Sequence, residues 1–158
     1  MTLKDIMTSD PLCCLPGHTA VHAAQIMKQA HVGVVPVIDS EQGRKPIGVV
    51  TDRDLCLTVI AQDRQPSTVQ VQDCMTKEVV TASLHDTVAQ AAERMGDQQI
   101  RRLLVVDDQG ILQGIVATAD LVQRAHAPTG QTHETLAKVT EPSTQASKPR
   151  EQMVKNAA

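Results

Sequence analysis

GVVTDRDL, at residues 48–55, returns 66 positions later as GIVATADL, at residues 114–121. Each copy has a glycine, two β-branched residues and, six positions after the glycine, an aspartate. A short β-branched run that passes directly into polar residues is typical of a strand that enters a helix. Because the pattern occurs twice, we expect the chain to fold as two copies of one unit.

The repetition extends toward the N-terminus at a spacing of 68 positions. DIMT at residues 5–8 matches DCMT at residues 73–76, and Asp39 matches Asp107. The two-residue difference in spacing falls in one loop, at residues 40–47 in the first copy, whose Gly43 and Pro46 predict a hairpin turn. Further matched pairs with helical spacing are Thr19 with Thr87, Ala23 with Ala91, Ala24 with Ala92 and Met27 with Met95.

Each copy is expected to read strand, helix, strand, strand, helix, which makes the fold class α/β, of the α+β kind. In the first copy we expect strands at residues 12–15, 34–39 and 47–51 and helices at residues 19–30 and 52–61. One unit of roughly 60 residues buries too little surface to be stable alone, so the two copies should pack together as an intramolecular pseudo-dimer.

We therefore expect a first repeat at residues 1–66 and a second at residues 67–127. Residues 128–158 change in composition, with prolines among threonine, serine, glutamine and lysine, which predicts a flexible, disordered tail.

Composition excludes several classes of function. The 158 residues contain no Phe, Tyr or Trp, so bases cannot stack on aromatic rings, and the formal net charge of -3 argues against nucleic acid as a partner. No apolar run is long enough for a membrane span and no targeting segment is visible, so we expect a cytoplasmic protein without a membrane partner.

No catalytic or metal motif is present, and we expect no enzymatic activity and no required cofactor. His18 and His22 have i, i+4 spacing but no evident third ligand, which favours exposed helix-start histidines over a metal site. The cysteines contain no C-x-x-C pair and are expected to be buried, unreactive thiols. They are Cys13, Cys14, Cys56 and Cys74.

Thr51 and Asp54 lie three residues apart, on one face of a predicted first helical turn. One interpretation is that they only cap the helix. The other is a ligand site, because free backbone N–H groups at a helix start favour anions and polyols. The recurrence of the acid as Asp120 and of the glycine as Gly114 favours a site.

With these motifs the chain resembles tandem cystathionine β-synthase (CBS) domains, also called a Bateman module. The resemblance covers residues 1 to about 127 and rests on D-x-M-T, on the VPVID and LLVVDD strands and on GVVTDRDL. It implies two β-α-β-β-α repeats packed through their sheets, with clefts for adenosine-containing ligands. It assigns Thr51 to phosphate or ribose and Asp54 to the ribose diol.

The second copy departs from the family pattern, because Ala117 stands where the hydroxyl is expected. The family's basic pair that reaches across the cleft to phosphate corresponds to Arg101 and Arg102, with a solvated edge or an ion pair to Asp107 or Asp108 as the alternative. We therefore expect one competent site per chain. Its residues are Leu12, Cys13, Gly33, Val35, Val49, Thr51, Asp54, Arg101 and Arg102, and a weaker second site has Val80, Thr81, Ile115 and Asp120.

The resemblance implies a regulatory module that senses an adenine nucleotide and signals by conformational change or dimerisation, as a homodimer or through a protein partner. The expected ligand is AMP, ADP or ATP, ahead of S-adenosylmethionine or NAD. The alternatives are an interaction scaffold with vestigial clefts and an enzyme with an unrecognised site.

Overall fold

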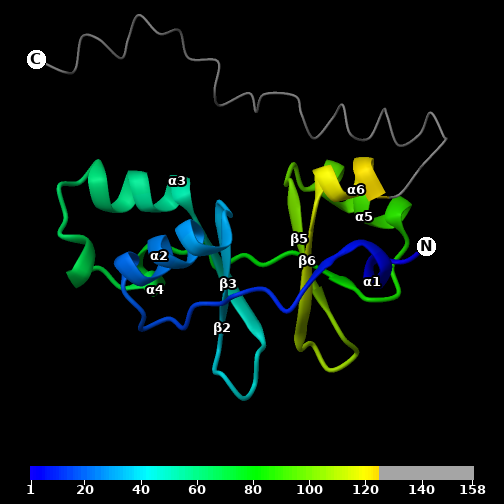
Figure 1. The fold of residues 1–158 in the computed structure, drawn as a ribbon, viewed down its shortest axis with the longest axis horizontal. Coiled ribbons are helices and arrows are strands. Elements are labelled where there is room, and N and C mark those ends of the chain that lie inside the picture. The colour runs from blue at the N-terminus through cyan, green and yellow to red at the C-terminus, as the bar shows by residue number, and fades with distance from the viewer. Residues whose placement is uncertain (125–158) are drawn as a thin grey trace, which may run out of the picture.

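The computed structural model describes residues 1–124, and the tail expected at residues 128–158 lies outside them. Two lobes lie side by side, each with its strands toward the centre of the molecule and its helices on the outside (Figure 1). This arrangement confirms two repeats of mixed α/β structure that pack through their sheets.

The first lobe is built on a two-stranded antiparallel sheet of β2 (Val34–Ile38) and β3 (Pro46–Thr51). Helix α2 (Ala20–Ala30) precedes the sheet and begins at Thr19, whose hydroxyl accepts a hydrogen bond from the His22 backbone N–H. After β3 come α3 (Asp52–Leu55), a π-helical turn at Cys56–Ile60 and a 3-10 turn at Pro66–Thr68.

The second lobe repeats this order and adds a strand from the start of the chain. Its sheet has the order β1-β6-β5-β4, with β1 at Thr8–Ser9, β4 at Thr81–Ser83, β5 at Arg102–Val106 and β6 at Leu112–Ala117. Helix α5 (Val88–Asp97) begins with a capping box between Thr87 and Gln90, and α6 (Thr118–Arg124) follows β6.

Two local predictions for the first copy need correction. The strand expected at residues 12–15 is only a single parallel bridge between Cys14 and Val37, because Pro11 and Pro16 flank a segment too short for a ladder. The helix expected at residues 52–61 is helical over that length, but it changes from α to π at Cys56.

Each repeat's opening helix packs into the other lobe. Helix α1 (Leu3–Ile6) lies beside α5 and α6, and α4 (Val71–Cys74) lies beside α2 (Figure 1). The Leu3 N–H donates to the Asp86 carbonyl at 2.9 Å, and the Val71 N–H donates to the His18 carbonyl at 2.7 Å. The two lobes are therefore joined by exchanged segments as well as by a shared surface.

The close approach of the exchanged segments explains the repeated glycines. A Cβ at Gly48 would lie 2.8 Å from the Met75 sulfur and 2.9 Å from the Thr76 carbonyl oxygen. A Cβ at Gly114 would collide with Met7 and would lie 2.9 Å from the carbonyl oxygen of Thr8. The D-x-M-T motif of one repeat thus contacts the glycine that opens the final motif of the other.

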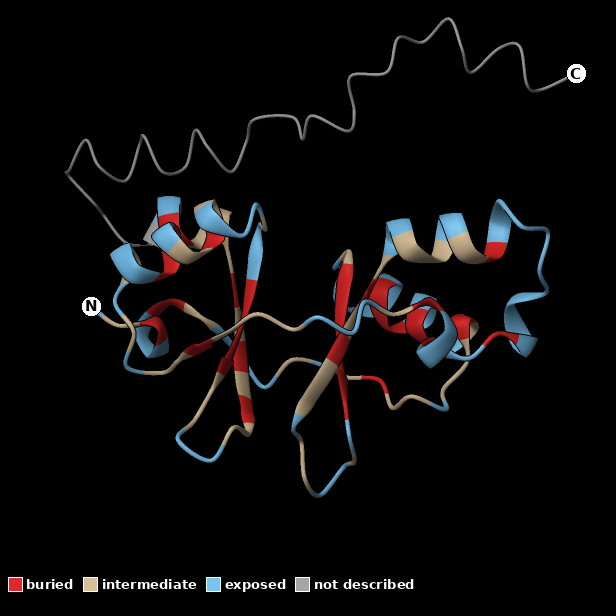
Figure 2. Cartoon of the chain, turned by 180° about the vertical axis from the view of Figure 1, so that it is seen from behind, coloured by how far each residue is buried: buried red, intermediate tan, exposed pale blue. Residues whose placement is uncertain are grey.

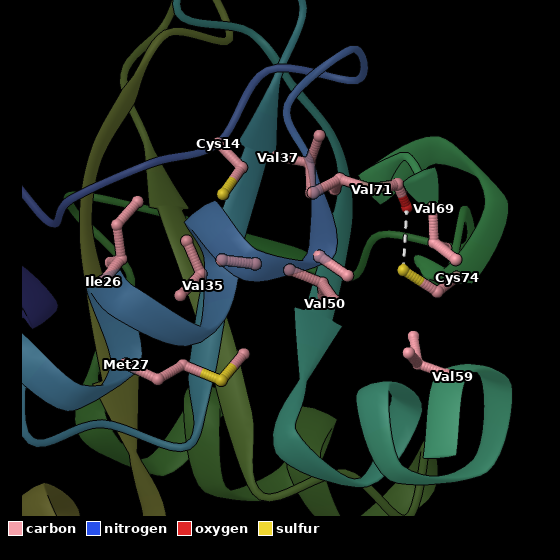
Figure 3. Packing of buried hydrophobic residues seen from close by; sticks show 12 residues of the cluster. Cys14, Ile26, Met27, Val35, Val37, Val50, Val59, Val69, Val71 and Cys74 are labelled. Atoms are coloured by element: carbon pink, nitrogen blue, oxygen red, sulfur yellow. Dashed lines mark hydrogen bonds between the residues drawn. The ribbon is translucent and has the colours of Figure 1, made fainter. Parts of the chain in front are cut away.

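The buried residues form one cluster in each lobe and a third between the lobes (Figure 2). The first cluster contains Val69, Val71 and Cys74 from α4 and the residues before it (Figure 3). The second contains Leu3 and Ile6 from α1. The third joins Ile38 to Leu104 and Leu112, with partly buried aliphatic neighbours.

The cysteines differ from the expectation of four buried thiols. Cys14 and Cys74 are buried and Cys13 is half-buried, but Cys56 is exposed on the π turn. Burial raises the pKa of the Cys14 thiol to about 11. Among residues 1–124, no helix has both the length and the apolar character needed to cross a lipid bilayer.

Candidate ligand-binding site

Two cavities lie between the lobes, and each combines residues of both repeats. We call them the Thr51 cavity, of about 270 Å³, and the Asp120 cavity, of about 450 Å³. Val34, Arg102 and Ile115 line both cavities, so the two are adjacent.

The Thr51 cavity brings together a hydroxyl and two guanidinium groups from different repeats. Thr51 ends β3 in the first repeat, whereas Arg101 and Arg102 stand at the start of β5 in the second. The sequence predicted this combination across the two repeats. The remaining wall is mainly aliphatic and includes Val49, Val79, Val80, Ile100 and Leu104. Thr76 and Glu78 also line it, from the second repeat's crossing segment, which leads from α4 in the first lobe to β4 in the second.

The Asp120 cavity is formed by the opposite combination of segments. Asp120 and Ala117 come from the second repeat, and the facing wall comes from the first. That wall consists of the crossing segment at residues 8–12, which contains β1, of the end of α2 and the turn after it, and of the start of β2. Its residues are Thr8, Ser9, Asp10, Pro11, Leu12, Ala30, His31, Val32, Gly33, Val34 and Pro36.

Some residues predicted for one site line the other cavity. Leu12 was predicted with Thr51 and lines the Asp120 cavity, and Val80 was predicted with Asp120 and lines the Thr51 cavity. Gly33 lines the Asp120 cavity, although its carbonyl accepts the Asp52 N–H, next to Thr51, at 3.1 Å. Pairing of the segments that follow α1 and α4 accounts for Leu12 and Val80. Because β1 pairs with β6, residues 8–12 lie against the second repeat's final motif, and the Thr76–Val49 bridge places the segment before Val80 against the first repeat's.

Val35 does not contact either cavity, because strand residues alternate between two faces. Val35 is fully buried in the first lobe's core, whereas its neighbour Val34 lines both cavities. Cys13, Asp54 and Thr81 also lie outside the residues that line the two cavities.

Thr51 and Asp54 form a reciprocal capping box at the start of α3. The Asp54 N–H donates to the Thr51 Oγ1 at 3.1 Å, and the Thr51 N–H donates to the Asp54 Oδ2 at 2.9 Å. The capping interpretation of these two residues is therefore realised in the structure. It leaves the Thr51 side chain on the cavity wall, so a ligand role is compatible with it.

The second repeat keeps half of this arrangement. The Ala117 N–H donates to the Asp120 Oδ2 at 2.8 Å, but Ala117 has no hydroxyl to accept a bond in return. The Asp120 cavity therefore has a carboxylate on its wall where the Thr51 cavity has a hydroxyl.

The alternative ion pair of Arg101 or Arg102 with Asp107 or Asp108 is not formed. Asp107 instead accepts hydrogen bonds from the hairpin, including the Ile111 N–H at 2.9 Å and the Gln113 side chain at 2.8 Å. In the described part of the chain, the ion pairs are Arg44–Asp10 and Arg94–Asp86. Both cavity arginines are exposed, so their guanidinium groups are open to an anion.

Sequence reasoning missed the polar residues of the crossing segments, chiefly Ser9 and Asp10 in one cavity and Thr76 and Glu78 in the other. The signal available was their position at the end of D-x-M-T or directly after it in each repeat. Within residues 1–124, no three His, Cys, Asp or Glu side chains are grouped so that they could hold a metal ion.

The geometry is that of a paired repeat module with ligand-sized cavities at its internal interface. The CBS domain family model matches the chain twice, at residues 3–60 and 71–127. The chain belongs to the CBS domain family, as a pair of CBS repeats.

Similar curated proteins include the CBS domain-containing protein YhcV of Bacillus subtilis, 41% identical over 76% of this chain and 82% of YhcV. Protein MK0525 of Methanopyrus kandleri is 34% identical over 78% of this chain, which spans only 62% of that relative's length. Inosine-5'-monophosphate dehydrogenase of Bacillus subtilis is 30% identical over 72% of this chain, but the match covers only 22% of that enzyme.

Solved structures give the same result. The CBS domain pair of protein MJ0100, in complex with 5'-methylthioadenosine and S-adenosyl-L-methionine, matches with a TM-score of 0.68 and 28% identity, over 78% of this chain and 94% of that one. Hypoxic Response Protein I, with two coordinated zinc ions, matches with a TM-score of 0.70 and 26% identity, over 81% of this chain and all of that one.

Proposed function

We propose that this chain is a regulatory CBS-pair module that binds an adenosyl ligand, AMP, ADP or ATP, between its repeats and signals through conformational change or homodimerisation. The observation that carries the proposal is the Thr51 cavity, in which Thr51 of one repeat faces Arg101 and Arg102 of the other. A ligand held there contacts both repeats and therefore favours the arrangement that fits it best.

The chemistry of the walls suits an adenosine phosphate. Exposed arginines provide charge-assisted hydrogen bonds to phosphate oxygens. Aliphatic residues such as Val49, Val80 and Ile100 offer apolar surface to a purine without any aromatic ring. The adenosyl ligands of the MJ0100 pair support the same ligand class for this chain.

Affinity measurements with separate changes in each cavity test the proposal. We expect calorimetry to detect AMP, ADP or ATP, and we expect the combined change Arg101→Ala and Arg102→Ala to weaken binding at least tenfold, the size of one or two lost charge-assisted bonds. Asp120→Asn keeps the shape of the Asp120 cavity, and its effect on the affinity measures how much that cavity contributes to binding. A stoichiometry of two ligands per chain would overturn the expectation of one competent site.

The capping box favours a second candidate, a ligand-free interaction scaffold. Thr51 and Asp54 already satisfy each other, and a vestigial motif would keep those bonds for helix stability alone. If AMP, ADP, ATP, NAD and S-adenosylmethionine all fail to bind at millimolar concentration, the scaffold becomes the better account.

A further inference from the structure

Arg44 occupies a backbone position that is unfavourable for arginine. Its φ is 48°, in the left-handed region, and the matching position of the second hairpin holds Gly110 with φ 77°. The two positions correspond because each comes directly before the residue whose carbonyl accepts the N–H of the aspartate that opens the turn. These carbonyls belong to Lys45 in the first hairpin and to Ile111 in the second. Glycine adopts this conformation freely, whereas a residue with a Cβ is strained there. Such an outlier calls for a compensating contact.

The Arg44 side chain provides that contact. Its Nη2 lies 2.8 Å from the Oδ1 of Asp10, in a pair whose arginine side chain is 33% exposed and whose aspartate side chain is 86% exposed. Asp10 also has a left-handed backbone, with φ 47°. The ion pair thus joins the first hairpin to the crossing segment directly after β1.

Backbone bonds connect the same two residues to the second lobe. The Leu112 N–H donates to the Arg44 carbonyl at 2.9 Å, and the Asp10 N–H donates to the Gln113 carbonyl at 3.0 Å. The hairpin of the first repeat, the crossing segment and the start of β6 therefore meet at Arg44 and Asp10.

The second repeat shows what the crossing segment does without this ion pair. Glu78 stands at the position that matches Asp10, and no arginine follows in the second hairpin. Thr76 makes a single bridge with Val49, and within residues 1–124 no backbone bond extends that bridge to Glu78. The first crossing segment instead pairs at Thr8 and Ser9 and continues to Asp10.

We propose that Arg44 is a positioning residue for the Asp120 cavity. It holds Asp10, and with it the crossing segment at residues 8–12, against β6, although Arg44 does not itself line the cavity. The crossing segment supplies Asp10, Pro11 and Leu12 to that cavity. The ligand-binding consequence rests on the proposed function, but the positioning does not.

The positioning is tested without ligand by amide hydrogen exchange in the full chain. Arg44→Gly removes the side chain and relieves the backbone, so the fold should persist. We expect the Asp10 amide to exchange roughly two- to five-fold faster, the effect of losing an exposed ion pair. Arg44→Lys should restore most of the protection, and Lys45→Ala, which removes the adjacent exposed cation, should leave it unchanged. The Thr76 amide, bonded to Val49, is the internal reference.

The binding arm uses AMP, followed by NMR signals of Leu12 and Val80, which line different cavities. Val80 reports the expected competent site in the Thr51 cavity, and Leu12 reports the weaker site in the Asp120 cavity, which calls for higher AMP concentrations. Arg44→Gly should weaken the AMP response at Leu12 by a similar factor and leave Val80 unaffected. If the wild-type protein binds none of AMP, ADP and ATP, the proposed function fails, while the exchange rates still decide the role of Arg44. Unchanged Asp10 exchange in Arg44→Gly would overturn the inference.

Discussion

Single residues of the final motifs carry two roles that the sequence could not separate. Thr51 caps α3 through its hydroxyl and also forms part of a cavity wall. Asp120 bonds the Ala117 N–H and also lines the other cavity. A substitution at either position therefore changes the stability of the free protein, and ligand effects must be measured against that change.

Removing the cap measures how much it contributes to the stability of the free protein. We expect Thr51→Ala to lower the free energy of unfolding by about 0.5–2 kcal/mol, because the Asp54 N–H loses its acceptor. Thr51→Ser keeps the hydroxyl and should stay close to the wild type. Urea denaturation without ligand measures both, and equal stability of the two variants would show that the cap contributes nothing.

The glycine of the second motif is required for close contact. Gly114→Ala should destabilise the protein by about 1–3 kcal/mol, because the new methyl group would collide with Met7 and with the Thr8 backbone. Gly17→Ala is the matched control, since no atom lies within 4 Å of a Cβ there. Thermal unfolding compares the two, and equal melting temperatures would contradict the contact.

His18 should make the fold sensitive to mild acid. Burial, with a smaller effect of neighbouring His22, lowers the pKa of His18 below 6.5. Its Nδ1 accepts a bond from the Leu15 N–H at 3.1 Å, which the protonated ring cannot do. The unfolded chain then binds more protons than the folded one, so stability is full above pH 6.5 and decreases as the pH falls through the lower folded pKa.

His18→Asn offers a carbonyl oxygen in place of Nδ1 and does not titrate. Urea midpoints at pH 7.5 and pH 5.5 should therefore fall less in His18→Asn than in the wild type. An equal fall in both would assign the pH dependence to other groups.

At the scale of elements, the exchanged helices α1 and α4 are short but lie in the cores. Leu3 is fully buried among residues of the second lobe, and Val71 is fully buried in the first. Neither helix has enough residues to be stable alone, so packing against the other repeat is what holds each of them.

Leu3→Ala should accordingly act on the distant second repeat. We expect a loss of about 2–5 kcal/mol, the usual cost of such a cavity. Hydrogen exchange should speed up in α5 and α6 more than in α2. The exposed Met1 is a control, because Met1→Ala removes a side chain that is 67% exposed. A loss confined to the first lobe would contradict the packing.

Local signals were enough to predict α2, the hairpin of β2 and β3, and the helix start at Thr51, because each depends on neighbours in sequence. The partners of DIMT and DCMT could not be predicted in the same way, because a four-residue motif does not specify which sheet it joins. That one missing fact placed Leu12 and Val80 in the opposite cavities. Because the side chains of β2 alternate between its two faces, Val34 lines the cavities whereas Val35 lies in the core.

At the scale of the whole molecule, the residues that pack into one core do not coincide with one repeat of the sequence. The first lobe's core needs Val69, Val71 and Cys74, which follow residue 66. A fragment of residues 1–66 should therefore remain unfolded, whereas a fragment of residues 10–77 contains every member of that core and should be the more structured of the two. Dispersion of amide signals in NMR spectra distinguishes them, and a folded 1–66 fragment would contradict this prediction.

The exchange of α1 also sets an order of events during synthesis. Leu3 and Ile6 are synthesised well before their last buried neighbour, Leu121. At about 5–20 residues per second, these two apolar side chains wait roughly 6–24 seconds for their partners. For that interval the nascent chain presents apolar side chains without their partners, which a chaperone could recognise.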